Sequence, residues 1–252
     1  MNARKNQSAG GLALQLSLLL LLLVGLGALV GSEGFAGLQI QADFSLIADI
    51  RLPRTLGACL AGALLGLAGA LAQGLFRNPL ADPYLLGSAS GASLGVASAL
   101  ALFGGNPFAT ELLVRVGLTG AAFVGAVLAV LLTLSLARGV QHTLRLLLAG
   151  VIVGVVLGAL ASLISLLRPD VLQGMQGFLL GSTSFIGWTS CFLMLTVLLI
   201  CWVVAFFLSR VLDALSLGEA TAVSLGLPLA PLRVALVCVL ALATGTAVAQ
   251  TG

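Results

Sequence analysis

The sequence predicts an all-α membrane protein, a polytopic bundle of transmembrane helices that forms a single domain over residues 1–252. Hydrophobic residues make up 60% of the chain, charged residues make up 8%, and the mean hydropathy is +1.21. Soluble domains carry about a quarter charged residues, so an ordinary soluble fold is excluded. Several apolar runs also reach about 20 residues, which is the length that crosses a bilayer.

Seven apolar runs lie between charged, proline-rich or glycine-rich breaks, and each is predicted to be a membrane-spanning helix. The first run is closer to membrane-spanning length than to the core of a cleaved signal peptide, so we expect a retained first helix. A short additional helix is expected near the membrane surface between residues 168 and 188, with Trp188 as an interfacial anchor and Trp202 as a packing residue. The predicted spans are 12–31, 56–76, 85–104, 111–137, 143–167, 189–209 and 231–250.

The distribution of arginine and lysine favours a cytoplasmic N-terminus, because positive residues accumulate in cytoplasmic loops. With that orientation, the outer side receives Arg51, Arg54, Arg115 and Arg168. The cytoplasmic segments receive Arg4, Lys5, Arg77, Arg138, Arg145, Arg210 and Arg233.

The stretch from residue 51 to residue 93 organises the chain. Pro53 suits a helix start and places two arginines at the outer mouth of the second span, whereas the prolines of the 78–83 loop end that span on the inner side. The glycines and serines of 87–95 predict a helix inside the bundle or beside a pathway, with close packing as the simpler explanation. The same small-residue spacing predicts tight helix crossings at Gly62/Gly66 and at Gly150/Gly154/Gly158.

Two blocks of sequence resemble the FecCD/BtuC-type permeases, the membrane subunits of ABC importers for iron-siderophores, haem and cobalamin. The first block consists of Arg51-Leu-Pro-Arg54, the run from Gln73 to Pro83 and the run from Leu86 to Ala92. The second block is Leu217-Gly-Glu-Ala-Thr-Ala222 followed by Leu225-Gly-Leu-Pro228. The blocks stand in the family's order, and the resemblance covers nearly the whole chain. Since members have ten helices, about seven are expected here, and the chain is expected to be truncated at its C-terminus.

The resemblance implies a multi-pass protein of the bacterial cytoplasmic (inner) membrane, and it also implies four partners. These are a cytoplasmic ABC ATPase, a periplasmic or lipid-anchored substrate-binding protein, a second permease copy forming a homodimer, and membrane lipid. The net charge of +3 is spread over loops, so nucleic acid is not an expected partner. The cargo is expected to be an iron-siderophore-type chelate, with cobalamin and haem left open.

The resemblance also assigns candidate site residues. Arg51 and Arg54 would dock the substrate-binding protein by pairing with glutamates, although simple anchoring at lipid headgroups is an alternative. Residues 213–228 would couple to the ATPase through a short helix from about Gly218 to Leu225, for which Glu219 also offers a simple dipole-capping role. The coupling candidates are Leu217, Gly218, Glu219, Ala220, Ala222 and Gly226, and the translocation-path candidates are Gln73, Asn78, Pro79, Gly87, Ser88, Ser90 and Gly91.

Catalytic and metal chemistry find no support in the sequence, and we expect neither a cofactor nor enzymatic activity. The four cysteines lie in apolar segments without metal-ligand spacing, and the single histidine, His142, has no carboxylate near it in sequence. A Walker A loop is absent from the sequence. Because no span carries an acidic residue or a lysine at its centre, an external energy source is favoured. A secondary carrier or channel, or a non-functional truncated fragment, remains the alternative.

Overall fold

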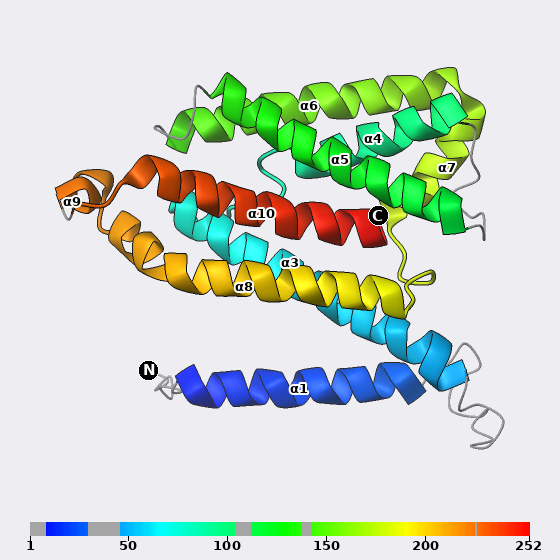
Figure 1. Ribbon diagram of the computed structural model, residues 1–252, viewed down its shortest axis with the longest axis horizontal. Coiled ribbons are helices and arrows are strands. Elements are labelled where there is room, and N and C mark those ends of the chain that lie inside the picture. Colours follow the sequence, from blue (N-terminus) through cyan, green and yellow to red (C-terminus); the bar gives the residue numbers. More distant parts are fainter. Residues whose placement is uncertain (1–8, 30–45, 104–111, 138–142, 225) are drawn as a thin grey trace, which may run out of the picture.

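The computed structural model describes residues 9–29, 46–103, 112–137, 143–224 and 226–252. Within these ranges the regular structure is helical and includes no strand, as the sequence predicts. Figure 1 shows the long helices lying side by side along one common direction. The elements are α1 (Ala9–Leu29), η2 (Ile47–Arg51), α3 (Leu52–Phe76), α4 (Ser88–Phe103), α5 (Leu112–Leu136), α6 (Thr143–Leu167), α7 (Pro169–Leu180), α8 (Trp188–Ser216), α9 (Glu219–Ser224) and α10 (Leu229–Thr251).

Six of the described helices are long and apolar enough to cross a membrane, namely α1, η2 with α3, α5, α6, α8 and α10. The remaining predicted span, 85–104, is shorter than expected because α4 has 16 residues and begins only at Ser88. Its start is set by Gly87, whose φ of +82° interrupts the helix. At 1.5 Å per residue α4 extends about 24 Å, less than the thickness of the hydrocarbon core.

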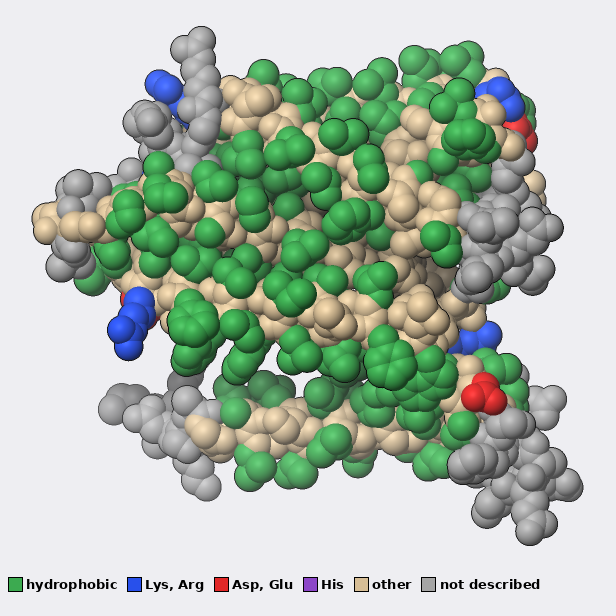
Figure 2. Space-filling view, in the orientation of Figure 1, with side chains coloured by type: hydrophobic (Ala, Val, Ile, Leu, Met, Phe, Trp, Pro, Cys, Tyr) green, Lys and Arg blue, Asp and Glu red, His purple; other side chains and the backbone are tan. Residues whose placement is uncertain are grey.

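Two hydrophobic clusters form the core, and α10 contributes to both of them. The larger cluster joins α3, α8 and α10, and the smaller joins α4, α5 and α7 to the end of α10. In Figure 1 α10 lies between α5 on one side and α3 and α8 on the other, and 67% of its membrane-length window is buried. Apolar side chains cover the middle of the face in Figure 2, while charged side chains gather towards the two ends of the helices. This distribution is the one a bilayer requires.

Small residues bring several backbones together, although not at every position that the sequence suggests. Gly150 meets the backbone of Leu85, and a Cβ at Gly154 would lie 3.7 Å from the Cα of Gly87, so the predicted crossing on α6 is confirmed. By contrast, Gly62 and Gly66 are exposed on α3, and among the described residues nothing would contact a Cβ there within 4 Å. The predicted crossing at these two glycines is therefore wrong within the described structure.

Two further sequence-based predictions need correction, and the buried position of one arginine is added to them. Trp202 is not a packing residue, because it is 57% exposed on α8 and stacks on Phe206. Arg233, which belongs to the predicted span 231–250, is buried in the first turns of α10. The sixth span does not end near residue 209, because α8 continues to Ser216 and the first helix-breaking glycine comes at position 218.

Candidate functional site

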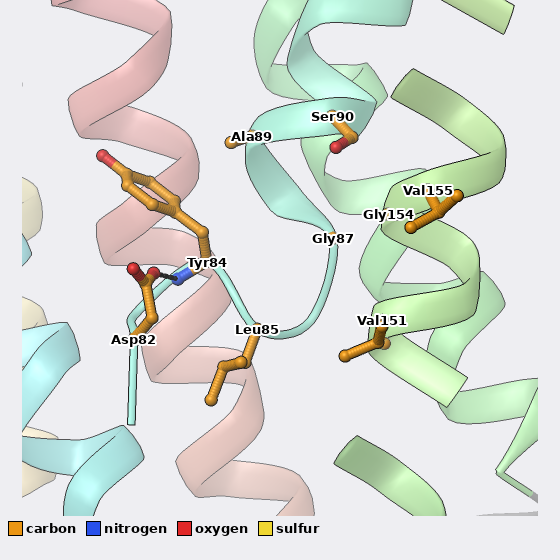
Figure 3. A pocket seen from close by; sticks show the side chains of 10 residues that line it. Asp82, Tyr84, Leu85, Gly87, Ala89, Ser90, Val151, Gly154 and Val155 are labelled. Atoms are coloured by element: carbon orange, nitrogen blue, oxygen red, sulfur yellow. Dashed lines mark hydrogen bonds between the residues drawn. The ribbon is translucent and has the colours of Figure 1, made fainter. Parts of the chain in front are cut away.

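A groove of about 420 Å³ lies where the loop after α3 enters α4. One side of the groove is formed by the chain from residue 82 to residue 90, and the other side is formed by α6. Figure 3 shows Gly87 and Ser90 facing Gly154 and Val155 across this space. The lining residues are Asp82, Tyr84, Leu85, Gly87, Ala89, Ser90, Gly150, Val151, Gly154 and Val155.

The loop that forms this groove is shaped by prolines and by short polar side chains. Arg77 ends α3 in the left-handed conformation with φ of +50°, and its N–H bonds back to the last turn of the helix. The side chain of Asn78 accepts a bond of 2.9 Å from the N–H of Leu80, and the side chain of Asp82 accepts one of 2.6 Å from the N–H of Tyr84. Each of these residues precedes a proline, which offers no N–H of its own, so the side-chain turns replace backbone bonds.

The start of α4 is packed against α5 on the side away from the groove. Thr133 of α5 is fully buried and its hydroxyl donates a bond of 3.0 Å to the carbonyl of Leu86. Ser88 is also fully buried, and its hydroxyl has no hydrogen-bond partner among the described atoms. Gly91 lies against the backbone of Gly125, so a larger residue would not fit at either position.

The structure thus divides the seven translocation-path candidates into three groups. Gly87 and Ser90 line the groove, whereas Ser88 and Gly91 face the interior between α4 and α5. The other three are exposed at the end of α3 and in the loop that follows, outside the groove lining: Gln73, Asn78 and Pro79.

The groove has one acidic group and one phenol near its rim. Burial, followed by the nearby charge of Asp82, raises the pKa of Tyr84 above its ordinary value of 10.0. The phenol therefore stays neutral across the physiological pH range. The rest of the lining is small or aliphatic, so this surface offers contact area and few directed bonds.

Asp82 belongs to the first sequence block and Tyr84 lies between two of its runs, but neither residue is among the sequence-predicted site residues. The signal that identifies Asp82 is its position before a proline in a polar turn, where a side-chain acceptor is needed. Gly154 and Val151 join the groove only through the packing of α6 against the loop, and sequence spacing alone does not indicate that contact.

The two candidate docking arginines lie at the start of α3, at the same end of the bundle as α7 in Figure 1. Arg51 is partly exposed and donates a bond of 3.3 Å from Nη1 to the carbonyl of Leu29, while Arg54 is exposed. At this end Arg168 forms an exposed ion pair of 3.2 Å with Asp170, and its hydrogen bond lowers the pKa of the Asp170 carboxyl. Such an exposed pair adds little stability.

The candidate coupling segment lies at the opposite end of the bundle, where Figure 1 shows α9. Gly218, with φ of +114°, separates α8 from α9, and Gly226, with φ of +77°, follows α9. The predicted short helix is confirmed, with bounds Glu219–Ser224. Leu217 is 69% exposed, whereas Ala222 is fully buried against the bundle.

Some sequence-based predictions fall outside what the structure describes. The side chains of Glu219 and Ala220 are not described, although both residues belong to α9. His142 lies outside the described residues altogether. In the described part of the chain, no group of three or more histidine, cysteine, aspartate or glutamate side chains forms a candidate metal site.

Comparison with known proteins gives consistent matches over almost the whole chain. The model of the FecCD transport family matches residues 13–252. The ferric enterobactin transport system permease protein FepD of Escherichia coli K12 is 41% identical over 223 residues, which cover 84% of this chain and 65% of FepD. The vitamin B12 import system permease protein BtuC of Salmonella paratyphi A is 37% identical over 243 residues, which cover 95% of this chain and 72% of BtuC.

A third bacterial relative and one solved structure extend the comparison. The ABC transporter permease protein YvrB of Bacillus subtilis is 38% identical over 224 residues and is matched over 63% of its length. An ABC transporter assigned to the metal-chelate type, solved in an inward-facing conformation, superposes with a TM-score of 0.82 at 29% identity. The match covers 96% of this chain and 76% of the chain in that solved structure. The chain spans less than two thirds of the length of FepD and YvrB.

Proposed function

Because the chain belongs to the FecCD transport family, we propose that it is the membrane-spanning permease subunit of an ABC importer for an iron-siderophore-type metal chelate. The observation that carries this proposal is the family match over residues 13–252 together with the groove that the family-like motif builds against α6. FepD, whose name refers to ferric enterobactin, supports a ferric chelate, and BtuC supports vitamin B12 as the competing cargo.

The experiment that tests this proposal is uptake into liposomes. The chain is reconstituted with an ABC ATPase and a substrate-binding protein from the same organism, and radiolabelled ferric siderophore and vitamin B12 are offered in separate assays. The proposal is supported if siderophore uptake requires ATP on the side of the membrane where the ATPase is bound. Uptake driven by a proton or sodium gradient without ATP would instead identify a secondary carrier, and uptake of vitamin B12 alone would correct the cargo.

The groove between the start of α4 and α6 is the proposed part of the translocation path. It is open to the surface, and the two valines of α6 that border it are exposed, Val151 to 46% and Val155 to 67%. A second permease copy packed on this face would turn the groove into an enclosed path and would cover the apolar side chains. Cysteines placed at Val151 and Val155 should therefore cross-link between two copies in membranes, and monomeric behaviour would contradict the homodimer.

Arg51 and Arg54 are proposed to dock the substrate-binding protein. Their position at the start of α3, at one end of the bundle, supports this role, as does the suitability of guanidinium groups for pairing with carboxylates. Replacing both arginines with glutamate should abolish association with the binding protein while the protein remains inserted in the membrane. If association persists and does not depend on salt, the docking role is wrong.

Residues 213–228 are proposed to couple the permease to its ATPase. A six-residue helix such as α9 is not stable alone, and its location at the opposite end of the bundle from Arg51 supports contact with a cytoplasmic partner. The exposed Leu217 is a better contact candidate than Ala222, whose side chain is used for packing within the chain. Charge substitution at Leu217 should then reduce binding of the ATPase without loss of folded protein.

The proposed orientation places the N-terminus, the 78–83 loop and α9 in the cytoplasm. The excess of arginine and lysine on this side supports it. Single cysteines at Asn78 and Ser216 should resist a membrane-impermeant thiol reagent in intact cells, whereas a cysteine at Gln41 should react. The reverse labelling pattern would require the opposite orientation.

A further inference from the structure

A single turn of π-helix precedes α3 and contains Arg51. This turn, η2, spans Ile47–Arg51, and the N–H of Leu52 bonds to the carbonyl of Ile47, five residues earlier. The next bond in the same pattern would run from residue 53 to the carbonyl of Ala48. Residue 53 is proline, which has no N–H, so the i→i−5 pattern supplies no donor to the Ala48 carbonyl.

The missing donor is supplied by a residue that is 140 positions away in the sequence. The indole Nε1–H of Trp188, the first residue of α8, donates to the carbonyl of Ala48 at 3.1 Å. The indole ring also lies against Phe192, with ring centroids 6.2 Å apart, which fixes its direction from within α8. Trp188 thus completes the π turn that Pro53 leaves incomplete.

Two other contacts hold the same two helix starts together. The thiol of Cys191 donates to the carbonyl of Pro53 at 3.1 Å. The side chain of Ile186, which lies just before α8, fills the space beside Gly57 so closely that a Cβ there would overlap it. The start of α8 is therefore fastened to the start of α3 at three successive points.

The π turn determines where Arg51 points relative to Arg54. A π turn holds one more residue than an α turn, so conversion to regular α-helix would rotate residues 47–51 by about 100° about the axis of α3. The present arrangement lets Nη1 of Arg51 reach the carbonyl of Leu29 at the end of α1 while Arg54 remains exposed. A rotation of that size would remove Arg51 from this position.

We propose that Trp188 is a positioning residue for the docking arginines, because its indole N–H replaces the amide that Pro53 lacks and so holds the π turn that orients Arg51. The role in docking rests on the proposed function of Arg51 and Arg54. The structural part of the proposal, that Trp188 maintains η2, does not depend on any partner. The two parts are therefore tested by separate readouts.

The first readout is hydrogen exchange of the peptide 46–56 in the purified protein in detergent. Trp188→Phe keeps an aromatic ring beside Phe192 but removes the donor, and we expect exchange in this peptide to accelerate about 2- to 10-fold, as for loss of one ordinary hydrogen bond. Trp202→Phe is the matched control, because Trp202 is the other tryptophan and is exposed on the same helix. It should leave the peptide unchanged.

Pro53→Ala provides the second test, because it restores a backbone N–H in this turn. In the double variant Trp188→Phe/Pro53→Ala, exchange should return towards the level of Pro53→Ala alone. If Trp188→Phe does not accumulate as folded protein, the comparison of the double variant with Pro53→Ala still decides the question. Equal exchange in Trp188→Phe and Trp202→Phe would overturn the proposal. Exchange in the double variant that stays well above the level of Pro53→Ala alone would overturn it as well.

The second readout is the Kd for the substrate-binding protein that supports uptake in the liposome assay. Trp188→Phe should weaken association about 2- to 10-fold and Trp202→Phe should not change it. Arg51→Glu/Arg54→Glu is measured in the same assay. If the arginine variant binds normally, the docking function is wrong, whereas accelerated exchange in Trp188→Phe would still establish its role in holding the turn. A third outcome is that the arginine variant loses affinity while Trp188→Phe shows accelerated exchange and an unchanged Kd. That outcome would refute the proposal that Trp188 positions the arginines for docking.

Discussion

Replacement of Gly125 by alanine should destabilise the bundle, while the same replacement at Gly120, on the same helix, should not. A Cβ at Gly125 would overlap the carbonyl of Gly91 and would lie 3.2 Å from the Cα of Gly95. These neighbours are backbone atoms of α4, so no side-chain rotation can relieve the overlap. At Gly120 nothing among the described residues lies within 4 Å of the added methyl group.

The magnitude follows from two opposing terms. Alanine in place of glycine in an unobstructed helix stabilises by about 0.4–1 kcal/mol, because the unfolded chain loses freedom. This term is common to both sites. Overpacking in a close-packed interior costs about 1–3 kcal/mol, and it applies only to Gly125. The two variants should therefore differ by about 1–3 kcal/mol, which is roughly 5- to 150-fold in the unfolding equilibrium.

The assay is unfolding of the purified protein in mixed micelles with increasing SDS, followed by circular dichroism of the helices. Gly125→Ala should unfold at a lower SDS fraction than the unaltered protein, and Gly120→Ala should unfold at the same or a higher fraction. Gly91→Ala, the reciprocal change on α4, should resemble Gly125→Ala. If Gly125→Ala and Gly120→Ala unfold together, the close approach of α4 and α5 does not contribute as argued.

Three further predictions concern single side chains. Tyr84 is the chain's one tyrosine, so its ionisation can be followed by ultraviolet absorbance. The midpoint of this ionisation should lie above pH 10.0. The folding stability that comes from the neutral phenol should be fully present below pH 10.0 and be lost as the pH rises through the folded-state pKa. Asp82→Asn should lower this midpoint but leave it above 10.0, because burial is the larger cause. Thr133→Val should cost about 1–3 kcal/mol by leaving the Leu86 carbonyl without its donor, as measured by SDS unfolding, whereas Thr133→Ser should cost less. Ala222→Leu should lower the yield of folded protein, because this fully buried position has no room for a larger side chain.

Each of these has an outcome that would contradict it. A Tyr84 midpoint at or below 10.0 would mean that the phenol is solvated. Equal unfolding of the valine and serine variants at Thr133 would mean that its hydroxyl is not important for stability. Ala222→Leu should be compared with Leu217→Ala, which alters an exposed side chain of the same segment, and equal losses of folded protein would show that burial does not distinguish the two positions.

The sequence alone determined the features that depend on neighbouring residues. Long apolar runs specified the membrane-length helices, because every backbone group in a bilayer must be bonded within its own segment. Prolines and glycines placed the breaks after Phe76 and around α9, because they remove donors or require unusual backbone angles. The docking and coupling candidates came from the family resemblance, and the structure places them at opposite ends of the bundle.

Only the tertiary structure decided which of several similar residues pack together. The same glycine spacing gives a close crossing at Gly150 and an open surface at Gly62, because the first faces the loop at Leu85 and the second faces no described neighbour. Two tryptophans on one helix likewise differ, since Trp188 donates a hydrogen bond to the Ala48 carbonyl before α3, whereas Trp202 is exposed and stacks on Phe206 of its own helix. Such contacts join residues that are tens of positions or more apart in the chain. Local sequence patterns specify the shape of each helix, but contact between two helices depends on which surface the rest of the chain places opposite.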